Sequence, residues 1–231
     1  MENKDAREAQ RSIRASAESK PQWWGDCKVC GDSFDLESLQ PKGACPSCRR
    51  YFNVSLLKIP SRFLVNFEVN QQNKCADQTS RGFVDGNKSV YIFGTPGSGK
   101  THLAYLSYAE SLDKLKKSKF VKVPEIMSAE HEPGESKDHF IGRIAYQLCK
   151  TDLLYLDELI PERHSDELLG VIYQVLDFAF EKGRPRIFMT CNFGLDMVTK
   201  LSDRIASRIA GICGSDNVVE NNDEDWRLKG G

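Results

Sequence analysis

The chain has 231 residues, of which 40% are hydrophobic and 28% charged, and its formal net charge is −1. This composition is ordinary for a folded protein with a sizeable core, and it excludes a polycation, so any nucleic-acid contact must come from a local basic patch. No apolar stretch has the length of a membrane span, and the polar N-terminus is no signal peptide, so we expect a cytoplasmic protein without membrane contact. In that reducing compartment, eight cysteines indicate metal ligands or buried thiols more than disulfides.

The N-terminal part divides into a polar arm and a cysteine-rich segment. Residues 1–20 alternate charges with alanine and serine, which predicts a solvated helix or an arm that orders only on a partner. Residues 21–55 contain two C-x-x-C pairs separated by fourteen residues, close to the spacing of a zinc site with four cysteine ligands. The expected zinc ligands are Cys27, Cys30, Cys45 and Cys48.

Zinc should supply the folding free energy of this segment, because it is too short for a good core. Such a closed site is structural and not catalytic. Two disulfides or four free thiols are the alternative. The flanking aromatic and basic residues could stack on nucleic acid, dock a protein or simply cover the small core, and the sequence leaves these three interpretations open.

A connector at 56–88 leads to residues 89–231, where strands alternate with helices. The predicted strands are 89–94, 120–123, 152–159 and 186–192, and the tail offers one weak strand more. The predicted helices are 99–116, 139–149, 165–182 and 194–210, with a polar loop at 124–138. This alternation predicts an α/β fold with a mostly parallel central sheet and helices on both faces.

The stretch GTPGSGKT fits the phosphate-loop pattern G-x-x-x-x-G-K-[ST], with a strand before it and a helix after it. Glycines let backbone N–H groups surround phosphate oxygens, and the helix N-terminus adds a favourable dipole. Lys100 should neutralise the β- and γ-phosphates, Thr101 should ligate magnesium, and His102 should lie at the nucleotide edge without a catalytic role. The expected contacts of the loop are Gly94, Thr95, Pro96, Gly97, Ser98, Gly99, Lys100 and Thr101.

Two further strands end in polar residues that suit nucleotide hydrolysis. The apolar run DLLYLDEL places Asp157 and Glu158 at the C-terminal edge of the sheet, where ligands bind. Asp157 should hold magnesium and Glu158 should polarise the attacking water. Asn192 ends the strand RIFMTCN and could orient that water if the strand lies between the other two; a turn residue is the alternative.

Two arginines and a basic run remain ambiguous from the residues alone. Arg204 and Arg208 are four apart, hence on one helix face, and spacing alone favours two exposed surface arginines. The run KLKKSKFVK at 114–122 is the only dense basic run. It more often marks a solvated helix end than a phosphate-backbone contact.

The chain resembles the AAA+ helicase loaders of the DnaC/DnaI type and the related IstB-like ATPases of transposition. The segments that carry the resemblance are IPSRFLVNFE (59–68), GTPGSGKTHLA (94–104), DLLYLDEL (152–159), RPRIFMTCNF (184–193), LSDRIASRI (201–209) and DEDWRL (223–228). The resemblance implies an AAA+ core with little or no C-terminal lid. It favours a sensor role for Asn192, which would orient the attacking water. It implies that Arg208, with Arg204 as the alternative, is an inter-subunit finger, an arginine that contacts the nucleotide of a neighbouring subunit. It implies that Arg227 is a second sensor, which reads the nucleotide state.

The same resemblance implies partners. Self-association through the nucleotide interface, a replicative DnaB-type helicase that contacts the zinc segment, and single-stranded DNA are expected, with ATP, Mg²⁺ and Zn²⁺ as cofactors. The leading hypothesis is an ATP-dependent helicase loader acting in replication initiation; the brevity of the chain and the missing lid favour a phage. One alternative is a transposition helper that binds duplex DNA. The other is a zinc-bearing adaptor whose nucleotide-binding core is nearly inert.

Overall fold

The computed structural model describes residues 24–26, 33–35, 59–60, 63, 67–129 and 131–225, so the expected polar arm at 1–20 lies outside the described residues. The chain divides into two compact units, Met1–Phe52 and Asn53–Gly231. In the first unit, β1 (Trp24–Asp26) pairs antiparallel with β2 (Ser33–Asp35). The described part of the second unit holds the predicted strands and helices together with the phosphate loop.

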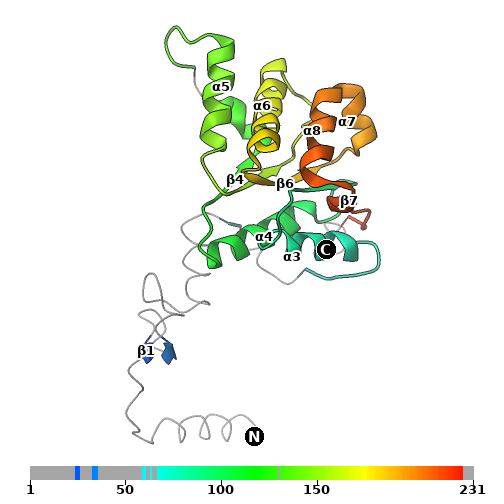
Figure 1. Ribbon diagram of the computed structural model, residues 1–231. Helices are drawn as coiled ribbons and strands as arrows, with labels where there is room; N and C mark the ends of the chain where they lie inside the picture. Colours follow the sequence, from blue (N-terminus) through cyan, green and yellow to red (C-terminus); the bar gives the residue numbers. More distant parts are fainter. Residues whose placement is uncertain are drawn as a thin grey trace, which may run out of the picture. The chain divides into compact units, whose positions relative to one another are not determined.

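The second unit is built on a five-stranded sheet in the order β4-β5-β6-β3-β7, and neighbouring strands run parallel (Figure 1). Its strands are β3 (Val90–Phe93), β4 (Ser118–Lys122), β5 (Leu153–Asp157), β6 (Arg186–Cys191) and β7 (Val218–Glu220). The predicted α/β class is therefore confirmed. Strand β6 lies between β5 and β3, as the interpretation of Asn192 required.

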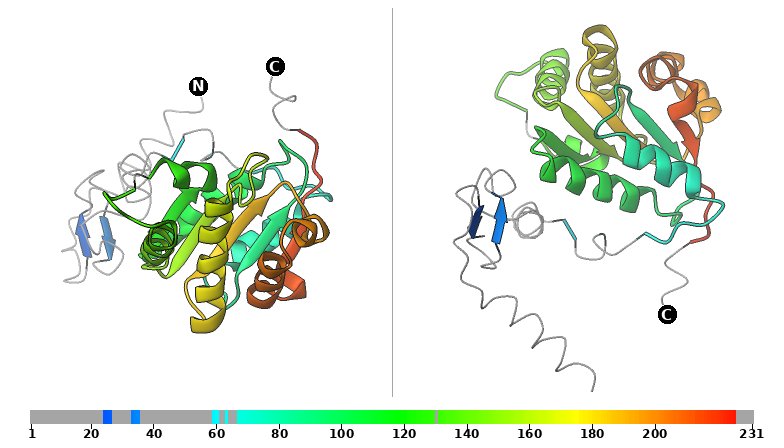
Figure 2. Two further views of the ribbon diagram at one scale, coloured as in Figure 1. Left: turned by 90° about the horizontal axis from the view of Figure 1, so that it is seen from above. Right: turned by 60° about the horizontal axis from the view of Figure 1, so that its bottom comes forward.

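Helices cover both faces of this sheet (Figure 2). One face carries α3 (Lys74–Gly82) and α4 (Lys100–Asp113). The other carries α5 (Lys137–Leu148), α6 (Asp166–Lys182), α7 (Leu195–Leu201) and α8 (Asp203–Cys213). Two short 3₁₀ segments, η2 (Val123–Ser128) and η3 (Ser215–Asn217), complete the described elements, and η2 occupies the start of the segment predicted as a polar loop.

Alternating side chains of the strands divide the core into two layers. On β5, Leu154 and Leu156 pack with α5, α6 and α8, whereas Leu153 and Tyr155 pack with α3 and α4. Strand β5 is buried along its whole length, which explains its continuous apolar sequence. Phe188 of β6 stacks on Tyr155 with 5.6 Å between ring centroids, so the second layer contains packed aromatic rings beside its aliphatic residues.

One predicted helix was wrong and one observed helix was not predicted. The single helix predicted at 194–210 is two helices, because Ser202 leaves the helical conformation and its side chain accepts a hydrogen bond from the N–H of Ile205 as the N-cap of α8. Helix α3 was not predicted. Its residues lie in the polar connector, and it buries only a narrow face around Ala76 and Ser80.

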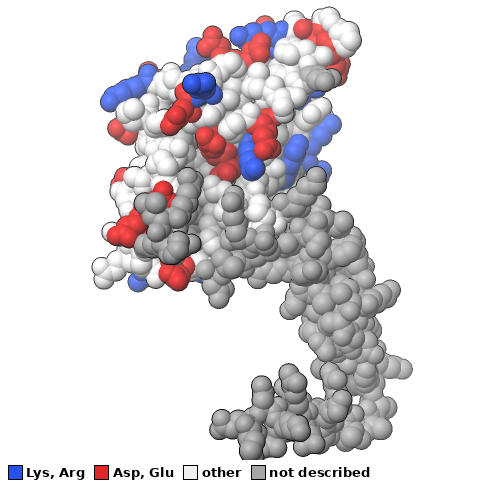
Figure 3. Space-filling model, turned by 180° about the vertical axis from the view of Figure 1, so that it is seen from behind, with Lys and Arg blue, Asp and Glu red and all other residues white. Residues whose placement is uncertain are grey.

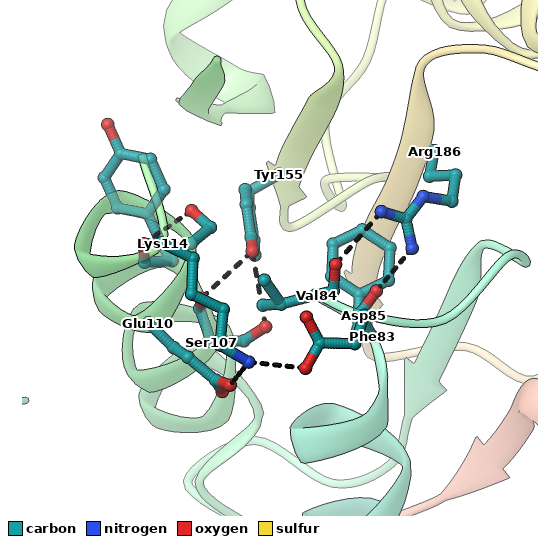
Figure 4. Close-up of polar contacts among 10 residues, drawn as sticks. Phe83, Val84, Asp85, Ser107, Glu110, Lys114, Tyr155 and Arg186 are labelled. Atoms are coloured by element: carbon teal, nitrogen blue, oxygen red, sulfur yellow. Dashed lines mark hydrogen bonds and ion pairs between the residues drawn. The ribbon is translucent and has the colours of Figure 1, made fainter. Parts of the chain in front are cut away.

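The end of the connector is fixed to the core by polar contacts (Figure 4). The guanidinium of Arg186 donates to the carbonyl oxygens of Phe83 and Val84 at 2.7 and 3.1 Å. Lys114 bonds Asp85 at 2.5 Å and Glu110 at 2.7 Å. The hydroxyl of Tyr155 donates to the carbonyl of Ser107 at 3.0 Å across the same region. Lys114, the first residue of the basic run at 114–122, is therefore engaged in ion pairs within the fold.

The other lysines of that run are exposed. Lys116, Lys117 and Lys119 form no ion pair with another described residue. In the view of Figure 3, however, basic and acidic side chains are interspersed over the described surface and do not form one positive field. Among the described helices, none is long and apolar enough to cross a membrane.

Candidate nucleotide-binding site

The phosphate loop connects β3 to α4 and depends on left-handed glycines. Gly94, Gly97 and Gly99 have φ angles of 147°, 82° and 92°, which L side chains rarely adopt. At Gly94 there is also no space, because an added Cβ would lie 2.0 Å from the carbonyl oxygen of Asn221. Gly99 is the N-cap of α4, so the loop ends at the positive end of a helix dipole.

Lys100, the first residue of α4, places its ammonium over the loop. Its Nζ donates to the carbonyl oxygens of Gly94 and Thr95 at 2.9 and 2.7 Å, and the residue is only 8% exposed. A positive charge is thus held beside backbone N–H groups and the helix N-terminus. This combination is suited to a polyphosphate.

Thr101 and Asp157 meet at the C-terminal edge of the sheet. The Thr101 hydroxyl donates to Oδ1 of Asp157 at 2.9 Å, although the two residues come from different strand–helix units. Asp157 is 7% exposed and its carboxylate stands where β5 ends. A hydroxyl and a carboxylate oxygen side by side are the hard ligands that Mg²⁺ prefers.

Thr190 of β6 fixes this pair and was missed in the sequence. Its hydroxyl donates to Oδ1 of Asp157 at 2.6 Å and accepts from the N–H of Glu158 at 3.0 Å. Glu158 follows the strand with a φ of 59°, and its side chain is exposed. The hydroxyl within the otherwise apolar run IFMTC was the signal that could have revealed Thr190.

A cavity of about 760 Å³ joins these groups. It is within the usual size range of small-molecule sites, about 300–1,000 Å³. The predicted residues that line it are Pro96, Gly97, Gly99, Lys100, Thr101, His102, Asp157, Glu158 and Asn192. Gly94, Thr95 and Ser98 lie in the same loop, where Ser98 donates its N–H to the Thr95 carbonyl.

One wall of the cavity is aromatic. Phe63 stacks on Tyr105 with 4.7 Å between ring centroids, and Phe67 meets His102 edge to face at 5.3 Å. These rings and Pro60 line the cavity on the side of the connector. Such a flat apolar wall suits a nucleobase. His102 thus lines the cavity, whereas the positions of Phe63, Phe67 and Tyr105 in its lining were not predicted from the sequence.

The segment after β7 packs against the phosphate loop. The side-chain amide of Asn221 donates to the Ser98 carbonyl at 2.8 Å, and its backbone N–H donates to Phe93 at 2.7 Å. Asp223 accepts from the side-chain amides of Asn70 and Asn73 at 2.9 and 2.7 Å. The loop, the start of α3 and this segment therefore form one hydrogen-bonded unit.

The two arginines of α8 lie elsewhere and differ from each other. Neither Arg204 nor Arg208 lines the cavity. Arg208 is ion-paired, with its Nε 2.6 Å from Oδ1 of Asp177, and this hydrogen bond raises the pKa of Arg208 above its ordinary value. Arg204 is exposed and forms no ion pair with another described residue.

Several predicted site residues lie outside the described residues. These are Arg227 and the four cysteines Cys27, Cys30, Cys45 and Cys48. Among the residues that are described, no group of three or more metal-ligating side chains occurs. Cys191 and Cys213 are buried, and burial raises the pKa of Cys149 to about 11, as expected for core thiols.

Comparison with known proteins places these features in a family context. The family model described as IstB-like ATP binding protein matches residues 42–229. The replicative helicase loader DnaC of Escherichia coli (strain K12) is 29% identical over 182 residues, which is 74% of this chain and 73% of DnaC. A crystal structure of DnaI is similar with a TM-score of 0.56 at 21% identity, covering 72% of this chain and 93% of DnaI.

A structure of the replication initiator DnaA bound to AMPPCP and single-stranded DNA has a TM-score of 0.59 at 20% identity. That match covers 74% of this chain but only 53% of DnaA, so the chain spans about half the length of that relative. At these identities the solved structures establish the fold of the second unit and nothing finer.

Proposed function

The chain belongs to the IstB-like ATP-binding protein family, and from this premise we propose that it is an ATP-driven loader that places a replicative hexameric helicase on single-stranded DNA. The resemblance to DnaC/DnaI-type and IstB-like proteins and the AAA+ P-loop fold are confirmed. The chain is accordingly an ATPase of this fold. The finer assignments below are proposals that rest on the geometry of the site.

The observation that carries the proposal is the contact between Thr101 and Asp157. Their oxygens are 2.9 Å apart, and both residues line the same cavity as Lys100. These residues fit a nucleoside triphosphate with its magnesium, which when bound would neutralise phosphate charge. Lys100 would shift from the loop carbonyls to the β- and γ-phosphates, and the backbone N–H groups of Gly97 to Thr101 would surround them.

Glu158 and Asn192 would handle the attacking water. Both line the cavity, and they follow neighbouring strands β5 and β6. Glu158 would accept a proton from the water, and the side-chain amide of Asn192 would orient it toward the terminal phosphate. Because Thr190 bonds the backbone of Glu158, it would fix the direction in which that carboxylate leaves the strand.

Hydrolysis would also need a second copy of the chain. Arg208 does not line the cavity of its own subunit, so it would reach the triphosphate of a neighbour as an inter-subunit finger. Nucleotide state would then control how subunits hold together, and hydrolysis would release the helicase once DNA is in place. Arg227 would report on the nucleotide from the C-terminal segment.

The partners are proposed by analogy with the relatives. DnaC is a replicative helicase loader by name, and the DnaA structure contains single-stranded DNA. We assign helicase contact to a zinc-bound segment at 21–55, separate from the ATPase core at 89–231. A transposition helper acting on duplex DNA is the second candidate, because the family description names the IstB-like proteins.

ATPase measurements on Glu158→Gln test the proposal. With single-stranded DNA and helicase present, we expect hydrolysis to fall about 100-fold while ATP binding is retained, since only the proton acceptor is removed. Glu162→Gln, an exposed glutamate in the loop after β5, is the matched control and should behave as wild type. If wild type and Glu158→Gln are equally silent, the inert adaptor is the better description.

A further inference from the structure

Arg208 is held by side chains of α6, chiefly Asp177 and Phe180. Its Nε donates to Oδ1 of Asp177 at 2.6 Å, and its guanidinium carbon lies 4.6 Å from the centroid of the Phe180 ring. The side chains of Arg208 and Asp177 are 29% and 28% exposed, so this ion pair is partly screened from water. Tyr173, one turn earlier on α6, places its hydroxyl 3.4 Å from the same carboxylate oxygen.

The packing of α6 against α8 builds this arrangement. Asp177 and Phe180 are three residues apart on α6, and Arg208 and Gly211 are three apart on α8, so each pair shares a helix face. Gly211 makes room for the ring, because a Cβ there would lie 2.6 Å from Cε2 of Phe180. Phe180 is nevertheless 48% exposed. Its position is thus better explained by Arg208 than by the core.

The contact directs the guanidinium without covering it. The carboxylate engages Nε, the ring packs on the guanidinium, and Tyr173 adds a further hydrogen bond. The side chain of Arg208 is still 29% exposed, so part of the guanidinium can meet a phosphate. A free arginine side chain would lose rotamer freedom on reaching a neighbour, and prior fixation reduces that loss. Arg204, one turn earlier, is exposed and forms no ion pair with another residue that the structure describes.

We propose that Asp177 and Phe180 are positioning residues that hold Arg208 in the orientation in which it reaches the nucleotide of an adjacent subunit. The inference rests on the proposed function, because it takes Arg208 as the inter-subunit finger. It adds the reason why Arg208 and not Arg204 serves: among the residues that the structure describes, Asp177 and Phe180 orient Arg208, whereas no ion pair orients Arg204.

Mixed subunits test this directly. A Glu158→Gln chain supplies an intact Arg208 but has an inactive site, and an Arg208→Ala chain has an intact site but no finger. We call the Glu158→Gln chain the donor and the Arg208→Ala chain the acceptor. When the two are mixed with ATP and single-stranded DNA, ATP should be hydrolysed only in acceptor sites that are contacted by Arg208 of a donor. Asp177→Ala or Phe180→Ala added to the donor should lower kcat about ten-fold with little change in KM. The same substitution in the acceptor should change nothing.

Controls separate the possible failures. Glu181→Ala, an exposed glutamate on the same helix, is the matched donor variant and should leave kcat unchanged. Asp177→Asn, which keeps an acceptor oxygen but loses the charge, should give an intermediate kcat. The positioning role alone would be overturned if Asp177→Ala and Phe180→Ala in the donor gave the same kcat as Glu181→Ala. It would also be overturned if these substitutions lowered kcat equally in the donor and in the acceptor. If the mixture of Glu158→Gln and Arg208→Ala chains, with Asp177 and Phe180 intact, hydrolyses no ATP, Arg208 does not act on a neighbouring subunit's nucleotide. That result would overturn this inference as well.

Discussion

Thr190 shows how much a single hydroxyl organises in this site. It contacts the carboxylate of Asp157 and the backbone of Glu158, the two residues to which metal binding and proton transfer are assigned. No motif names this threonine, because its role follows from the neighbouring positions of β5 and β6. Sequence patterns therefore identified the groups to which nucleotide contacts are assigned but not the group that supports them.

Replacing Thr190 with valine should preserve the volume of the side chain but remove both hydrogen bonds. We expect a higher Mg²⁺ concentration for half-maximal ATPase activity and a kcat about ten-fold lower, because Asp157 and Glu158 lose a common support. Magnesium titrations of the ATPase rate measure this. Thr199→Val, an exposed threonine on α7, is the control. An unchanged magnesium dependence would contradict this supporting role.

The predicted and observed residues of the site differ in a consistent way. The phosphate loop, Asp157, Glu158 and Asn192 could be proposed because local motifs place them at the ends of apolar strands. Phe63 and Phe67 could not, because they precede the first strand and their contact with His102 and Tyr105 depends on how the connector folds back. A cavity wall built from segments that are distant in the sequence leaves no local sequence pattern by which it could be predicted.

At the scale of elements, strands were easier to predict than helix boundaries. Strands β5 and β6 are short, apolar and buried, so their sequences identify them. The break at Ser202 was missed because the apolar period continues through it, although a serine followed by an acidic residue is a common helix start. The capping hydrogen bond, not the period, decides where α8 begins.

The contact between the segment after β7 and helix α3 should carry measurable stability. Asp223 is 2% exposed and Asn73 fully buried, so Asp223→Ala would leave buried amide donors unpaired. We expect the free energy of unfolding to fall by about 1–3 kcal/mol. Urea denaturation followed by circular dichroism measures it, with the exposed Asp216→Ala as control. A loss below about 0.5 kcal/mol, the usual surface effect, would argue against this contact as a structural link.

At the scale of the whole molecule, the α/β class followed from the alternation of elements. The division into two compact units, Met1–Phe52 and Asn53–Gly231, assigns the four cysteines and the nucleotide site to different units. The arrangement of the four cysteines remains a prediction from their spacing. The division suggests that the two parts can be impaired independently.

Substituting both Cys45 and Cys48 with serine should therefore separate partner binding from catalysis. We expect the full chain to lose bound zinc and to lose capture of a DnaB-type helicase, because two of four ligands are removed. Intrinsic ATPase activity should stay within about two-fold of wild type. Metal analysis and co-purification measure the two effects, with Cys75→Ser, an exposed free cysteine, as control. Unchanged helicase capture after zinc loss would contradict the assignment of helicase contact to the zinc segment, whereas no capture by the zinc-loaded wild type would favour the transposition helper.

The hydrogen bond from Asn221 to Ser98 matters for labelled variants of this protein in single-molecule experiments. A fluorophore or pulling handle attached just after residue 225 would load a segment anchored directly on the phosphate loop. Tension applied there would reach the loop through the side chain of Asn221, and the backbone of the same residue would pass it to Phe93 of β3. Such a probe would disturb the phosphate loop that it is meant to report on, so dyes for single-molecule work should be attached to exposed positions of α5 instead.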